Sequence, residues 1–414
     1  MRKGWLIVIV LMLAGGGYLG AQAWSSMLFE RELTRTLDDL ENDDNLRVER
    51  EDIQRGWFVS RGRVKLLSAQ GEEWQVTIPY TARHGIVNTH AEGDLDIALG
   101  EAQERLFGDH LPVAPPRWNA SYASFSGEFD AQLTLASFTM EDDDAGWKLE
   151  TQGAEWDISG RRDDITMVGE VSPWTLNARR GELESGVLAF DSHYRVDSES
   201  GNVEQQDDVR LASLAYSGPL MPDIAIERWR YQGDMQMDDD QLRYAVSLSL
   251  DDASMGDQSL VGGGVKMTLS RLDADAAREV SMLIRDSLEQ GDRWDASQRR
   301  EFLQRLEPDV HAMLADSPRL TLDTVDLKSA MLDMLVDIEG ELVFDGEDVE
   351  TLSLDDWSSS EGVAAWRARL DGHVIWRDVP TLLLFQLGLP GDSDDLNLEI
   401  DSGEISLNGR SVAW

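Results

Sequence analysis

The chain has 414 residues, and its 79 acidic and 37 basic side chains give a formal net charge of −42. This charge excludes electrostatic binding of nucleic acid, because a phosphate backbone is bound by a basic surface. Cysteine is absent, which excludes disulfides, thiol nucleophiles and cysteine-ligated metal centres. Hydrophobic residues make up 42% of the chain and charged residues 28%, a balance typical of a folded protein with a sizeable core.

The N-terminus carries an uncharged apolar run over residues 4–21, preceded by Arg2 and Lys3. A helix of this length spans roughly 27 Å, close to the hydrocarbon thickness of a bilayer. Basic residues before the run and acidic residues after it predict an anchor over residues 1–24 in a bacterial inner membrane, with the bulk of the chain periplasmic. The alternative is a cleaved signal peptide, since Ala21-Gln22-Ala23 is similar to a small-residue cleavage site.

Two glycines in this run, Gly16 and Gly20, are four residues apart. Small residues at this spacing let two membrane helices approach closely, which favours a homodimer formed through the anchor. The alternative is that both glycines only loosen the end of a signal sequence.

The acid excess has two interpretations. Only five of the 37 basic residues are lysine, and acidic, lysine-poor surfaces suit proteins in high salt, where self-repulsion is screened. The other interpretation is an ordinary solvated acidic face. The runs 141–144 and 238–240 lack the spaced ligands of an EF-hand, so they predict solvated turns and no metal site.

Residues 25–50 have a helical pattern, which predicts a stem leading out of the membrane. The apolar residues that recur there are Met27, Phe29, Leu33, Leu37 and Leu40.

Residues 51–270 alternate apolar and polar side chains over short stretches separated by turn residues, which is the pattern of half-buried strands. Because no helical crossovers separate the stretches, the segment predicts a long, curved, antiparallel sheet and excludes a parallel α/β fold. Examples of the alternation are Trp74, Val76, Ile78 and Tyr80, then Leu95, Ile97 and Leu99, and later Tyr244, Val246, Leu248 and Leu250.

Residues 271–414 form the second predicted domain, with α+β character. Residues 273–289 have an apolar stripe of helical period, and so does the segment up to residue 316 that residues 295–298 can cap. The two predict a helical hairpin near residues 273–316 that packs on the sheet. Pro308 falls inside the second stripe and predicts a kink or a split. Strands resume at residues 320–325, and residues 379–387 predict a short buried helix led by Pro380.

No motif for metal, nucleotide or nucleophilic chemistry is present, so no catalytic, cofactor-binding or metal-binding residue is predicted. His84 and His90, if they lie on one strand, are roughly 20 Å apart and cannot share an ion. The glycines at 262–264 lie between apolar stretches and indicate a bend or bulge, not a phosphate loop.

Several short motifs together resemble the YdgA-like family of bacterial envelope proteins, a family of unassigned function. The signature Gly-Trp-Phe-x-Ser is followed by His-Gly and, near the C-terminus, by Asn-Gly; residue 86 is isoleucine where the family usually has proline. The matching residues are Gly56, Trp57, Phe58, Ser60, His84, Gly85, Asn408 and Gly409. The resemblance implies an N-terminal membrane helix and an envelope location, and no known activity.

Each motif also has a local physical interpretation. Gly56 allows a bulge or a positive φ where the stem meets the sheet, and Ser60 to Gly62 would form the next turn. Trp57 and Phe58 would point to opposite faces of a strand, so at least one belongs in the core. His84 would bond a backbone group. Asn408-Gly409 predicts a type I′ hairpin turn.

The sequence therefore favours a membrane-tethered, non-catalytic β-scaffold that binds a lipid or an envelope partner. A sheet that carries one apolar face and has few helices to cover it either curls on itself or presents an apolar groove. The alternatives are a purely structural dimer that maintains the envelope, and a hydrolase of unrecognised type.

Overall fold

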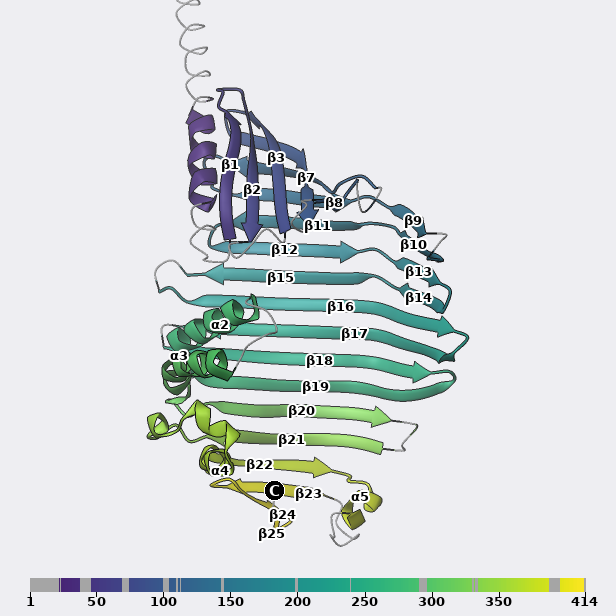
Figure 1. The fold of residues 1–414 in the computed structure, drawn as a ribbon, viewed down its shortest axis with the longest axis vertical. Helices are drawn as coiled ribbons and strands as arrows, with labels where there is room; N and C mark the ends of the chain where they lie inside the picture. Colours follow the sequence, from purple (N-terminus) through teal and green to yellow (C-terminus); the bar gives the residue numbers. More distant parts are fainter. Residues whose placement is uncertain are drawn as a thin grey trace, which may run out of the picture. The chain divides into compact units, whose positions relative to one another are not determined.

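The computed structural model describes residues 22, 24–37, 46–68, 74–99, 104–108, 111, 113–142, 145–197, 200–238, 240–289, 296–329, 331, 334–386 and 395–412. The chain divides into two compact units, unit 1 (Met1–Leu176) and unit 2 (Asn177–Trp414). The described residues contain 25 strands and few helices, and the sheet is antiparallel (Figure 1). The prediction of a mostly β fold is therefore confirmed.

Unit 1 contains twelve complete strands, and eight of them form a continuous antiparallel ladder in the order β1-β2-β3-β4-β7-β8-β11-β12. Another strand, β13 (Trp174–Ala178), contains the boundary between the units. The twelve strands are β1 (Leu46–Gln54), β2 (Val59–Ser68), β3 (Trp74–His84), β4 (Asn88–Asp94), β5 (Asp96–Leu99), β6 (Glu104–Arg105), β7 (Arg117–Ala123), β8 (Phe129–Leu135), β9 (Phe138–Asp142), β10 (Trp147–Thr151), β11 (Ala154–Arg161) and β12 (Asp164–Val171).

A helix over residues 24–37, the stem helix, packs on one face of this ladder. Its side chains at 29, 33 and 37 join a core cluster with Val64, Tyr80 and Ala82. The predicted helix over 25–50 is too long, because residues 46–50 belong to β1 and pair with β2. Val48 lies opposite Leu66 in that ladder, so strand pairing overrides the helical pattern of the sequence there.

Unit 2 contains a longer meander, in which each strand from β15 to β25 pairs antiparallel with the next. The strands of unit 2 are β14 (Gly181–Ser185), β15 (Leu188–Val196), β16 (Val203–Gly218), β17 (Met221–Met237), β18 (Gln241–Met255), β19 (Gln258–Asp273), β20 (Arg319–Ser329), β21 (Met334–Phe344), β22 (Leu370–Arg377), β23 (Leu396–Asp401), β24 (Glu404–Leu407) and β25 (Arg410–Val412).

The predicted helical hairpin is confirmed as α2 (Ala274–Glu289) and α3 (Ala296–Leu314). With η1 (Val349–Thr351), η2 (Leu354–Ser358) and α4 (Ser360–Arg367), it forms a core cluster that includes Leu306 and Trp366. α3 continues through Pro308, so a split there is wrong. Leu306 and Val310, on either side of the proline, both pack into this cluster, which holds the two halves in one helix.

Two smaller predictions in unit 2 are also confirmed, and a third is confirmed in part. α5 (Thr381–Gln386) is the short helix after Pro380, and its Leu384 is buried. Asn408 and Gly409 have φ values of 48° and 74°, as a type I′ turn requires. The bulge expected at the glycines 262–264 lies on the partner strand, between residues 250 and 253 of β18.

The apolar run of the predicted anchor, residues 4–21 with Gly16 and Gly20, lies outside the described residues. Within the part of the chain that the structure describes, no helix combines the length and the apolar character needed to cross a membrane.

Candidate functional site

The motif residues Ser60 and His84 meet in a buried polar cluster beneath the stem helix. Ser60 Oγ lies 2.8 Å from His84 Nε2, and His84 Nδ1 lies 3.1 Å from the hydroxyl of Thr89. From the stem helix, Ser25 Oγ lies 3.3 Å from the Thr89 hydroxyl and 2.9 Å from that of Ser124. None of these five side chains is more than 8% exposed. Hydrogen bonds between hydroxyl and imidazole groups therefore connect the stem helix to β2, β3, β4 and the turn after β7.

Burial lowers the pKa of His84, and the nearby carboxylate of Glu30 opposes this shift. A neutral imidazole has one donor and one acceptor nitrogen, and hydroxyl neighbours can satisfy either one. The expectation that the His84 ring bonds a backbone group is wrong, because both of its nitrogens bond hydroxyls. The backbone of His84 bonds Phe58 and Gln22 instead.

The contact between Ser60 and His84 has the distance of a nucleophile and its base, but its setting is not that of an open active site. Ser60 is 0% exposed and His84 is 3% exposed, so no substrate can reach the hydroxyl while the stem helix is packed. The other imidazole nitrogen, Nδ1, bonds the hydroxyl of Thr89. In a catalytic triad this nitrogen bonds a carboxylate, which stabilises the protonated ring. The arrangement holds the stem helix to the sheet.

An ion-pair group extends this attachment along the stem helix. The Glu30 carboxylate lies 3.1 Å from Arg50 and 3.3 Å from Arg55, and Arg50 also donates to the Tyr80 hydroxyl at 3.0 Å. The side chains of Glu30 and Arg50 are only 12% and 14% exposed, so solvent screens this pair little. The pair helps to fix the rotation of the helix over the sheet.

The remaining motif residues correct several expectations. Trp57 and Phe58 are 61% and 49% exposed, so neither belongs to the core, because both lie in the turn before β2. Gly56 has no positive φ; a Cβ there would lie 2.4 Å from the Val59 carbonyl oxygen, so a close backbone approach requires the glycine. Residues 60–62 belong to β2 and form no turn.

The two histidines 84 and 90 do not share a strand. A turn at 85–87 separates β3 from β4, and His90 pairs with Arg83 on the neighbouring strand. His84 is buried and His90 is exposed, so the two imidazoles do not form one site. Among the described residues, no group of His, Asp and Glu is arranged to hold a metal ion.

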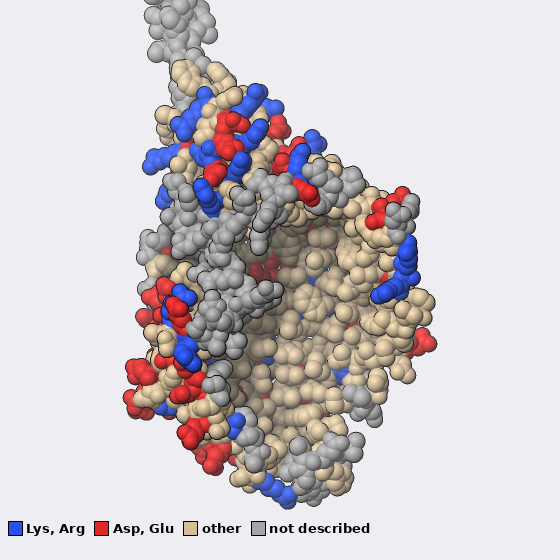
Figure 2. Space-filling view, in the orientation of Figure 1, with Lys and Arg blue, Asp and Glu red and all other residues tan. Residues whose placement is uncertain are grey.

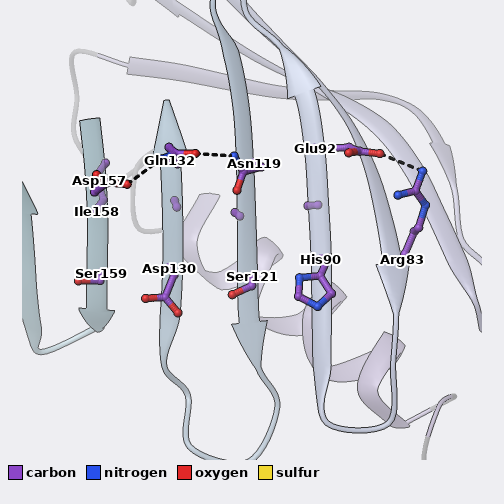
Figure 3. Close-up of a pocket in the computed structure, with 13 residues that line it drawn as sticks. Arg83, His90, Glu92, Asn119, Ser121, Asp130, Gln132, Asp157, Ile158 and Ser159 are labelled. Carbon is purple, nitrogen blue, oxygen red and sulfur yellow. Dashed lines mark hydrogen bonds and ion pairs between the residues drawn. The ribbon is translucent and has the colours of Figure 1, made fainter. Parts of the chain in front are cut away.

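A polar depression of about 520 Å³ crosses β3, β4, β7, β8 and β11 in unit 1 (Figure 3). Its side chains largely satisfy one another: Asn119 donates to Gln132, which donates to Asp157, and Arg83 pairs with Glu92 at 2.9 Å. His90, Ser121, Asp130 and Ser159 lie in one row across four strands. Paired, largely exposed groups of this kind are typical of a solvated sheet face, so this depression carries no functional assignment.

The most extensive candidate surface is an apolar face of unit 2. The pairing register places nine apolar side chains in one row across nine consecutive strands, β15 to β23. All of them except the last, which is buried, are only half-buried. The row consists of Phe190, Val209, Tyr231, Leu248, Val265, Val325, Ile338, Trp376 and Leu396.

A second row follows in the same register on the same face, two residues along each strand. It consists of Leu188, Leu211, Trp229, Leu250, Gly263, Leu327 and Val336. We call the surface made by these two rows the apolar trough.

The opposite face of the same strands is polar. One residue away from the first row, the register aligns Asp191, Asp208, Gln232, Ser247, Lys266 and Thr324. Figure 2 shows the apolar face of unit 2 as a hollow with few charged side chains, and Figure 1 shows helices along one side of this face. Burial, together with a hydrogen bond to Tyr231, raises the pKa of Tyr244 in this hollow to about 12. The trough is therefore a half-buried, largely apolar surface that can hold apolar molecules.

The sequence contains the signal for the trough, because its alternation fixes which side chains share a face. For the polar cluster it marks only Ser60 and His84, which belong to the short motifs. It gives no signal for Ser25, Thr89 and Ser124, which are far apart in the chain and belong to no catalytic motif.

A family model described as a bacterial protein of unknown function (DUF945) matches residues 1–351. The chain belongs to this family. No curated protein and no solved structure matches it. The DUF945 match includes all of unit 1 and the trough strands β15 to β21, whereas β22 to β25 and Asn408-Gly409 lie beyond it. Both the polar cluster and most of the apolar trough therefore lie within the family region.

Proposed function

We propose that this DUF945 protein is an inner-membrane-anchored, periplasmic, non-catalytic β-scaffold whose apolar trough holds the acyl chains of a lipid. The observation that carries the proposal is the unbroken row of nine apolar side chains across β15 to β23, opposite a polar row; eight of the nine are half-buried and Leu396 is buried. Large exposed apolar surfaces of soluble domains mark interaction sites, because leaving them in water costs free energy.

The dimensions of the trough suit acyl chains. Nine strands spaced about 4.8 Å apart give a row of roughly 38 Å. A bilayer core of about 30 Å contains two layers of acyl chains, so each chain needs about 15 Å of apolar surface. The trough is long enough for at least two chains in line, and its rows contain no charged side chain to interrupt them.

The predicted position of the body supports a lipid over other apolar ligands. The sequence places an apolar run at residues 4–21 after Arg2 and Lys3, so the bilayer would be the nearest source of apolar molecules. The finer resemblance to YdgA-like proteins, through residues 56–60 and 84–85, supports the same envelope location. We propose that location together with the function.

The test uses bacterial cells that incorporate a photoactivatable fatty acid into their phospholipids. After irradiation, the full-length chain is purified under denaturing conditions and its crosslinked lipid is quantified and mapped to peptides. We expect crosslinks in the strands of unit 2, because the trough would contact acyl chains.

Two adjacent residues of β18 provide a matched pair of variants. Leu248 is in the trough, whereas Ser247 is on the opposite face. Leu248→Asp should lower crosslinking in unit 2 at least fivefold, and Ser247→Asp should leave it unchanged, with circular dichroism confirming that both variants fold. Equal crosslinking in both variants would contradict lipid binding. A chain that carries no crosslinked lipid but is dimeric when purified without denaturant would favour the structural dimer.

A further inference from the structure

Exposed apolar side chains gather at one end of unit 1, in three turns of its sheet and at the start of the stem helix. The turns are residues 55–58, 85–87 and 124–128. Each of the six side chains is at least 38% exposed, and Phe125 reaches 67%. We call this group the turn patch; it consists of Trp24, Trp57, Phe58, Ile86, Val87 and Phe125.

Hydrogen bonds hold the three turns side by side. The backbone N–H of His84 donates to Phe58 O, and the N–H of Ser124 donates to Val87 O, both at 2.8 Å. The Trp24 ring lies 5.5 Å from the Phe125 ring, which joins the stem helix to the third turn. The patch is therefore one surface built on a rigid sheet end, and its aromatic rings are not needed by the core beneath it.

The turn patch lies where the described chain begins. Trp24 is three residues after the apolar run that ends at residue 21, so any membrane segment formed by that run would end beside the patch. Tryptophan and other aromatic residues are enriched at the boundary between bilayer and water. Next to the patch, Trp24, Met27 and Trp57 line an opening of about 790 Å³ together with Arg31 and Arg55. Both arginines are exposed, and guanidinium groups bind phosphate well. Arg55 also pairs with the Glu30 carboxylate, which lines the same opening.

We propose that the turn patch is a membrane-docking surface, which inserts its apolar side chains into the interface of the bilayer while Arg31 and Arg55 meet lipid phosphates. The patch would hold unit 1 at a fixed distance from the membrane, with its three turns directed toward the lipid. This inference goes beyond lipid binding in the trough. It rests on the proposed anchor over residues 4–21, which the experiment tests separately.

The absence of cysteine allows a clean test by single-site labelling. Phe125→Cys and Val87→Cys are each made in the full-length chain, labelled with a polarity-sensitive fluorophore and reconstituted into phosphatidylethanolamine–phosphatidylglycerol vesicles. Leu220→Cys is the control, because Leu220 is apolar and 80% exposed in the turn between β16 and β17 of unit 2. Iodide is present on both sides of the vesicles, and nitroxide-labelled lipids are the second quencher.

We expect iodide to quench the labels at positions 125 and 87 at least fivefold less than the label at position 220, and nitroxide lipids to quench only the first two. Docking is overturned if iodide reaches all three positions equally. It is also overturned if the patch labels are shielded from iodide but not quenched by nitroxide lipids, which would indicate burial against protein. Extraction of the chain from the vesicles by alkaline carbonate would overturn the anchor and the docking together, whereas an inserted chain with iodide-accessible turns would overturn the docking alone.

Discussion

The strands of both units alternate apolar and polar side chains, but the sheet faces of the two units are covered to different extents. In unit 1 the stem helix covers one sheet face, and Ala82, Ser60 and Thr89 beneath it are at most 1% exposed. In unit 2 the strands β16 and β18 contain no fully buried residue, although their apolar faces are as regular. Alternation thus fixes which side chains share a face, while a covering element decides whether that face becomes a core.

Polar side chains also have different surroundings in the two units. Beneath the stem helix, polar side chains are buried and bonded to one another, so their loss leaves unsatisfied partners. In the trough, the hydroxyls of Tyr231 and Tyr244 bond each other in side chains that are only half-buried. Unit 1 should therefore be sensitive to single substitutions at this covered face, and unit 2 tolerant at its open face.

The largest expected difference concerns two leucines. Leu37→Ala removes a buried side chain of the stem helix and should cost about 2–5 kcal/mol, the range for buried large-to-small changes. Leu248→Ala removes a half-buried side chain of the trough and should cost roughly 1 kcal/mol, because less apolar surface returns to water. Amide hydrogen exchange in the full-length chain measures the loss of local stability, in β2–β3 for Leu37→Ala and in β17–β19 for Leu248→Ala. Equal costs would mean that the trough is covered as fully as the core of unit 1.

A smaller difference concerns hydroxyl groups. Thr89→Val removes the hydroxyl that lies within hydrogen-bond distance of His84 Nδ1 and Ser25 Oγ. The buried Nδ1 then loses this partner, so the change should cost about 1–3 kcal/mol. The matched variant Tyr231→Phe in the trough should change stability by no more than about 0.5 kcal/mol, because water can satisfy Tyr244. Both changes in stability are measured by the same hydrogen-exchange experiment. A loss of stability well above about 0.5 kcal/mol for Tyr231→Phe would show that water does not reach the trough.

The smallest expected effect is a pH dependence of the attachment of the stem helix. The pKa of His84 is lowered from its ordinary 6.5 by burial, so the unfolded chain takes up the proton first as the pH falls. The contribution of His84 to the free energy of unfolding is therefore constant above about pH 6.5 and decreases below that pH. Thermal unfolding between pH 7.5 and 5.5 should show a steeper loss for the native chain than for His84→Asn, which cannot titrate. Parallel pH profiles for the two chains would show that the site is open to solvent.

Much of the fold could be predicted from local patterns. Strand alternation, the helical hairpin, the short helix after Pro380 and the Asn408-Gly409 turn follow from side-chain period and turn chemistry. The end of the stem helix could not, because residues 46–50 suit a helix or a strand until β2 pairs with them. The sequence also predicts at least one of Trp57 and Phe58 in the core, because their apolar character does not show that they lie in a turn.

The amino-acid sequence by itself determined the strand period, the side of each strand that is apolar and the apolar run before the body, because these depend only on the order of neighbouring residues. The tertiary structure alone decided that Ser60 and His84 meet under the stem helix, that nine apolar residues of unit 2 align in one row, and that three separate turns form one patch. Such groupings depend on the strand register and on which element covers a face. Both are settled by hydrogen bonds and packing between residues far apart in the chain.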